Sequence, residues 1–90
     1  MENKLLQRLS MINDAITDTL LTLDYLQQHV GDDKVNIMVH SSKPPHVVNT
    51  SPELSVGQAI LQLLIKEQND YLQELYKNKK SIKLELCKED

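Results

Sequence analysis

The sequence predicts a mainly α fold, in which two long amphipathic helices, at about 3–30 and 52–78, form a hairpin. Apolar residues recur every three or four positions along both segments, which is the spacing of one helix face. The three prolines all lie between the segments or at the first position of the second one, so none interrupts a helix. Ninety residues make one domain at most, so 1–90 is expected to be a single helical domain.

The first helix is expected over about 3–30, with spacings close to a heptad. Asn3 is a suitable N-cap, and Gly31 followed by two aspartates is typical of a helix end and a turn. A helix of about 27 residues is about 40 Å long. That length favours an elongated bundle or a coiled coil over a globular monomer. The apolar stripe consists of Leu5, Leu9, Ile12, Ile16, Leu20, Leu23, Leu26 and Val30.

A short β segment is expected near 34–41, because β-branched residues alternate there with other types. A single strand is unstable alone and needs a mate. Two mates are available: the same strand in a second subunit, or residues 81–87, where apolar residues also alternate. The alternating β-branched residues of the segment are Val35, Ile37 and Val39.

A proline-containing connecting loop is expected at 40–51. Pro44 and Pro45 fix the backbone and remove two hydrogen-bond donors, so they are expected to end the strand. Val47 and Val48 would then pack against a helix.

The second helix is expected over about 52–78. Ser51 is a suitable N-cap, and Pro52 suits the first helical position. Residues 79–90 fit either a continuing helix or a strand, and the absence of a helix breaker favours the helix. The apolar face consists of Val56, Ile60, Leu64, Tyr71, Leu72, Leu75 and Tyr76.

The charge balance argues against nucleic acid as a partner. The chain has a net charge of −3 and a pI near 5.5, whereas a duplex-binding protein presents a basic face to several phosphates. The run KNKK at 77–80 is the main basic stretch, and the chain has no Phe or Trp for base stacking.

Cysteine usage and hydropathy indicate a cytoplasmic protein with no membrane span. Cys87 is the only cysteine, which excludes an intrachain disulfide and fits a reducing compartment. The start of the chain lacks the pattern of a signal peptide, and no run approaches the ~20 apolar residues of a membrane helix.

Catalytic and metal-binding motifs are absent from the sequence. The three histidines do not stand in a recognised zinc spacing, and neither a nucleophile elbow nor a Ser-x-x-Lys motif occurs. His40 and Ser41 are neighbours on the expected strand, so their side chains would point to opposite faces. We therefore expect no enzyme activity, no metal site and no cofactor.

The connecting loop holds the polar residues most suited to a ligand or a partner. Free N–H groups at the start of the second helix could hold an anion, and basic side chains stand nearby in the sequence. Ordinary helix capping explains the same residues. The candidate loop residues are His40, Ser41, Ser42, Lys43, His46 and Ser51.

The apolar stripes are too wide for one helical hairpin to bury, which favours an oligomeric helical bundle, most simply a homodimer. Each buried apolar side chain contributes roughly 1.5–3 kcal/mol before chain entropy is subtracted. The candidate interface residues are Leu5, Leu9, Ile12, Ile16, Leu20, Leu23, Ile60, Leu64, Tyr71 and Leu75.

Two functional hypotheses follow. The leading one is a non-enzymatic homo-oligomer that binds another protein, as a small accessory, inhibitory or regulatory factor of the kind that phages and mobile elements carry. The alternative is a protein that binds or sequesters a nucleotide or another phosphorylated metabolite, using the 40–51 loop and the following helix start.

Overall fold

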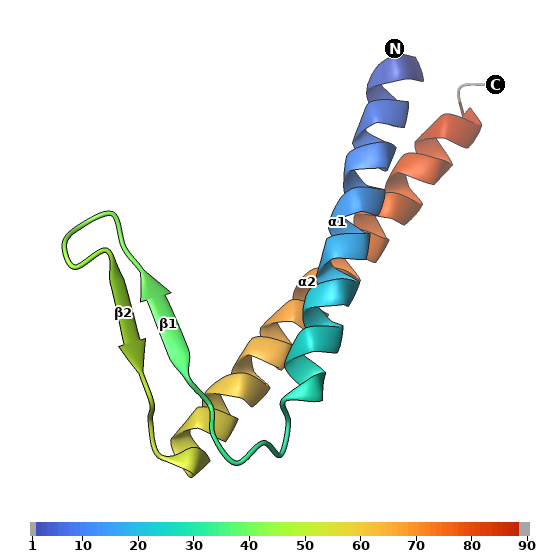
Figure 1. Ribbon diagram of the computed structural model, residues 1–90. Coiled ribbons are helices and arrows are strands. Elements are labelled where there is room, and N and C mark those ends of the chain that lie inside the picture. The colour runs from blue at the N-terminus through green and yellow to red at the C-terminus, as the bar shows by residue number, and fades with distance from the viewer. Residues whose placement is uncertain (1, 89–90) are drawn as a thin grey trace.

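The computed structural model describes residues 2–88, which form two antiparallel helices with a β-hairpin between them (Figure 1). The elements in chain order are α1 (Glu2–Gln28), β1 (Ile37–His40), β2 (Val47–Thr50) and α2 (Leu54–Lys88). The hairpin diverges from the helices at one end, and both ends of the described chain lie at the other end. The molecule measures 57 × 32 × 14 Å, and its radius of gyration is 18.0 Å, whereas a compact chain of this length has a value of about 12 Å.

The core is a single seam between α1 and α2. Buried and half-buried positions together recur at spacings of four and three along both helices, which is the pattern of a coiled-coil interface. One buried seam residue is polar: Thr19 is 4% exposed, and its hydroxyl donates a 2.7 Å hydrogen bond to the carbonyl of Ala15. The buried apolar residues are Leu5, Ile16, Leu23, Leu61, Ile65, Leu72, Leu75 and Ile82.

The second helix is longer than the interval 52–78 that the sequence suggested. It begins at Leu54 and continues through residues 79–88, while 89–90 lie outside the described residues. Ile82 explains the extension, because this side chain continues the seam and is only 1% exposed. The first helix ends at Gln28, two residues before the expected end.

The expected strand forms at Ile37–His40, but its mate differs from both predicted mates. It pairs antiparallel with Val47–Thr50, where the sequence predicts the connecting loop. Pro44 and Pro45, joined by a cis peptide bond, lie in the turn between the strands and therefore do not end the pairing. Val47 and Val48 are exposed on β2, so the expectation that they pack against a helix was wrong.

The side chain of Gln58 ties the end of α1 to the start of α2. Its carbonyl oxygen accepts a 3.2 Å hydrogen bond from the backbone N–H of Gly31. Its amide nitrogen donates to the carbonyl oxygens of His29 and Asp32, at 3.4 and 3.3 Å. Gly31 has a φ of +88°, a backbone conformation that favours glycine. One side chain thus fixes the turn from which the β-hairpin departs.

A close contact at Gly57 fixes the start of the β-hairpin. A Cβ atom built on this buried glycine would lie 2.9 Å from the Cβ of Val35, closer than ordinary van der Waals contact. The missing side chain therefore lets the segment before β1 approach α2. The hydroxyl of Ser51 donates to the side-chain oxygen of Asn36, so this predicted N-cap residue joins the two ends of the hairpin.

Candidate functional site

The predicted partner loop lies at the tip of the β-hairpin, which we call the arm (residues 37–50). The strand register pairs Ile37 with Thr50 at the base of the arm and His40 with Val47 near its tip. The tip is closed by a backbone hydrogen bond of 2.8 Å from Ser41 to His46. These residues are exposed and stand at the opposite end of the arm from the start of α2.

This placement divides the predicted loop residues into two groups. Ser41, Lys43 and His46 come together, because the Ser41 hydroxyl accepts a 3.1 Å hydrogen bond from the Lys43 N–H, and the His46 ring lies 3.2 Å from the Ser41 carbonyl oxygen. Ser51 lies instead at the base of the arm. The fold therefore does not bring the basic tip residues to the helix start that the alternative hypothesis requires.

The predicted interface residues also fall into two groups. Leu5, Ile16, Leu23 and Leu75 are buried, and Leu9 and Ile12 are half-buried on the same side of α1. Their contacts lie in the seam of one chain. The second group faces outward: Leu20, Leu64 and Tyr71 are exposed, and Ile60 is half-buried.

The outward residues of α2 belong to an apolar stripe over positions 56–71, which Glu67 interrupts. Three of its members, Ile60, Leu64 and Tyr71, each precede a seam residue by one position, so the stripe runs beside the seam along one helix face. It is about 22 Å long at 1.5 Å per residue. Leu63 is 66% exposed and Tyr71 is 49% exposed. This outer stripe consists of Val56, Ile60, Leu63, Leu64 and Tyr71.

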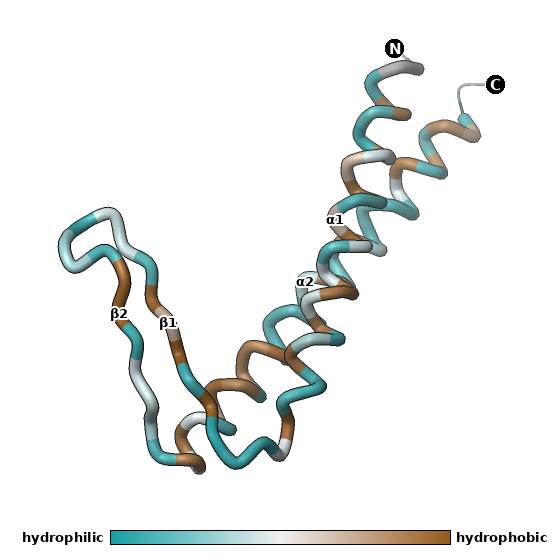
Figure 2. The backbone as a smooth tube through the Cα atoms, viewed as in Figure 1, coloured by the Kyte–Doolittle hydropathy of each residue, from teal (hydrophilic) through white to brown (hydrophobic). Residues whose placement is uncertain are grey.

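The arm carries a second apolar surface. Side chains alternate along a strand, so the register places Ile37, Val39 and Val48 on the same face of the ribbon, with Val39 opposite Val48. Both valines are exposed, and Ile37 is half-buried. Figure 2 shows hydrophobic segments on both strands and on the part of α2 near the arm.

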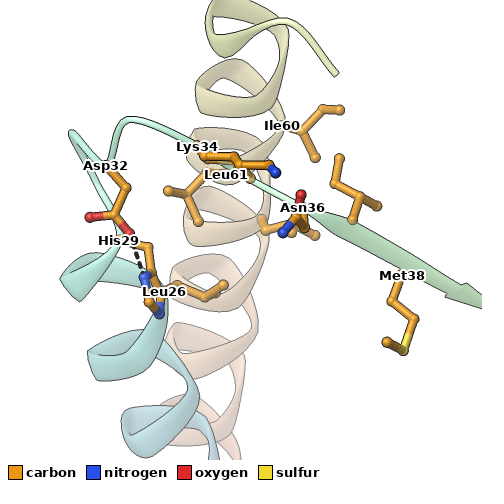
Figure 3. A pocket seen from close by; sticks show the side chains of 11 residues that line it. Leu26, His29, Asp32, Lys34, Asn36, Met38, Ile60 and Leu61 are labelled. Carbon is orange, nitrogen blue, oxygen red and sulfur yellow. Dashed lines mark hydrogen bonds and ion pairs between the residues drawn. The ribbon is translucent and has the colours of Figure 1, made fainter. Parts of the chain in front are cut away.

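A cavity of about 480 Å³ joins the two surfaces where the arm departs from the helices. Ile60 and Leu64 from the outer stripe and Ile37 from the arm all line it, and Figure 3 shows Ile60 and Met38 among its side chains. Polar residues also line it: the His29 ring lies 2.7 Å from the Asp32 carboxylate (Figure 3), and Lys34 and Asn36 belong to the same lining. The remaining lining residues are Leu26, Val35, Met38 and Leu61.

The outer stripe, the base of the arm and this cavity adjoin one another, and we call them together the V-shaped surface. It combines exposed apolar side chains with a few charged groups, as protein contact surfaces do. Within residues 2–88, no group of three histidine, cysteine or acidic residues is placed to hold a metal ion. Neither described helix contains a stretch long and apolar enough to cross a bilayer.

Sequence reasoning missed two features of this surface. The first is β2, for which the β-branched run in VVNT was a usable signal. The second is the role of Leu63 as the most exposed member of the outer stripe, because the sequence does not say which side of a wide stripe meets the other helix.

Comparisons of the chain with known protein families, with curated proteins and with solved structures find no match.

Proposed function

We propose that the protein works by binding protein chains. It self-associates as a homo-oligomer of helical hairpins, a dimer in the simplest form, and it presents the arm tip to another protein as a small accessory or regulatory factor. It needs no catalytic step for this role. The V-shaped surface is the observation that supports the proposal, because exposed apolar patches of this kind mark interaction sites.

The exposed area supports self-association. The solvent-accessible surface is 7105 Å², whereas a compact monomer of 10.3 kDa exposes about 5,400 Å². The chain therefore exposes about 1,700 Å² more than such a monomer. A standard protein interface buries about 800 Å² on each partner, so the surplus is enough for a complete interface.

The arm tip supports the second half of the proposal. It is polar, exposed and closed by hydrogen bonds among Ser41, Lys43 and His46. A tip that is already ordered loses little entropy on binding, so it suits the presentation of a fixed surface to a partner.

Two measurements test this function. Sedimentation equilibrium from micromolar to millimolar concentration should show a self-associating chain, and a monomer throughout that range would count against the proposal. Affinity capture from the native host should then recover a partner protein when the wild type is the bait. The tip variant Lys43→Glu/His46→Ala should no longer recover that partner. Lys83→Glu on α2, which changes one exposed charge far from the arm, is the matched control and should retain that protein.

The cavity favours ligand binding as a second candidate function. Its volume falls within the usual range for small-molecule sites, and its apolar lining with a few polar groups is typical of them. A thermal-shift panel of nucleotides and other phosphorylated metabolites tests this function. Stabilisation that is lost in Lys34→Ala would support it, and no shift with any compound would count against it.

A further inference from the structure

We propose that a second copy of this chain fills the V-shaped surface, with α2 packed antiparallel against α2 of that copy about a two-fold axis between Leu63 and Leu64. The inference rests on the self-association proposed above and specifies its geometry. A helix lying on the outer stripe would also meet the base of the arm, because Ile37 and Met38 line the same cavity as Ile60 and Leu64.

The pattern of the outer stripe favours this axis. In an antiparallel two-fold contact, residues of the two copies face each other in pairs, and the two residue numbers of every pair add up to the same sum. An axis between 63 and 64 places Leu63 opposite Leu64 of the second copy and Val56 opposite Tyr71. Each of these pairs joins two apolar side chains, and the second joins a small one to a large one, as interdigitated packing requires.

The same axis explains the one charged position within the stripe. Residue 67, which lies opposite Ile60 of the second copy, is an exposed glutamate. Ile60 lines the cavity together with Lys34, which is exposed. Glu67 of each copy therefore meets Lys34 of the other, and the contact gains two ion pairs.

A parallel arrangement of the two helices is disfavoured by charge. In a parallel two-fold contact every residue faces its own copy, so Glu67 would face Glu67. Two carboxylates held together repel each other and cost free energy, most of all where apolar neighbours exclude water. The antiparallel arrangement replaces this repulsion by attraction.

A charge exchange between Glu67 and Lys34 tests the inference. Sedimentation equilibrium is measured on the full chain for the wild type, Glu67→Lys, Lys34→Glu and the double variant. Each single variant should raise the dimer dissociation constant at least tenfold, and the double variant should return it to within about threefold of the wild type, because the pair is restored with opposite polarity. Glu85→Lys, which makes the same change on α2 beyond the stripe, should leave the constant unchanged.

The outcomes separate the two proposals. A monomeric wild type would overturn both self-association and this geometry, and would leave the V-shaped surface to a different protein. A dimeric wild type in which the two substitutions act independently would overturn only the geometry. Circular dichroism of each variant verifies that the helices are intact, so that a lost dimer is not mistaken for a lost fold.

Discussion

Replacement of Ile82 by alanine should destabilise the protein strongly, although this residue lies near the end of the described chain. Its side chain is 1% exposed and closes the seam beside the start of α1. Truncation of a buried isoleucine costs about 2–5 kcal/mol through lost burial and the cavity left behind. A domain of this length has a total stability of roughly 5–13 kcal/mol, so the loss is a large fraction of it. The melting temperature should fall by at least about 10 °C.

Leu84 provides the matched control. It lies two positions after Ile82 and its side chain has the same number of atoms, but it is 55% exposed. Leu84→Ala should change the melting temperature by no more than a few degrees. Both variants are compared by circular dichroism at one protein concentration, since self-association makes the melting temperature depend on concentration. Equal effects of the two substitutions would refute the packing of the α2 end against α1.

Three further predictions concern the start of α2 and its surface. Gly57→Ala should lower the melting temperature, because the new Cβ would lie 2.9 Å from that of Val35, and Val35→Gly in the same chain, which removes that Cβ, should restore part of the loss. Gln58→Ala removes three hydrogen bonds and should lower the free energy of unfolding by about 1–3 kcal/mol in chemical denaturation, with faster amide exchange at residue 31. Asp70 raises the pKa of Lys66 through a side-chain hydrogen bond and through its negative charge. The ion pair is therefore intact below the ordinary lysine pKa, and it is lost as the pH rises through the raised pKa of Lys66. Because this ammonium is exposed, Asp70→Asn should lower the Lys66 pKa measured by NMR while leaving the melting temperature at pH 7 unchanged.

The helical hairpin could be predicted from the sequence because the spacing of apolar residues directly reflects a helix face. Leu5, Ile16 and Leu23 recur at coiled-coil intervals, and all three are buried. The continuation of α2 to Lys88 was less certain, because Ile82 and Leu86 also fit an alternating strand. Contact with α1 decides between these patterns, and the sequence of α2 alone does not contain that contact.

The arm and the V-shaped surface could be predicted only in part. The strand at Ile37–His40 shows clear alternation, but the two prolines after it predict a strand end, whereas they lie in the turn of a hairpin. The stripe on α2 was recognised, but Leu64 and Tyr71 could not be separated from Leu75 by periodicity, because the stripe is wider than one helix can cover. Only the position of α1 shows which residues stay exposed.

Both ends of the described chain lie at one end of a molecule 57 Å long, and the arm lies at the other. A fluorescent reporter, a purification tag or a surface tether joined to either end would thus sit remote from the arm tip. The protein can be immobilised or labelled from both ends without blocking the tip, which suits it to display formats and to single-molecule work.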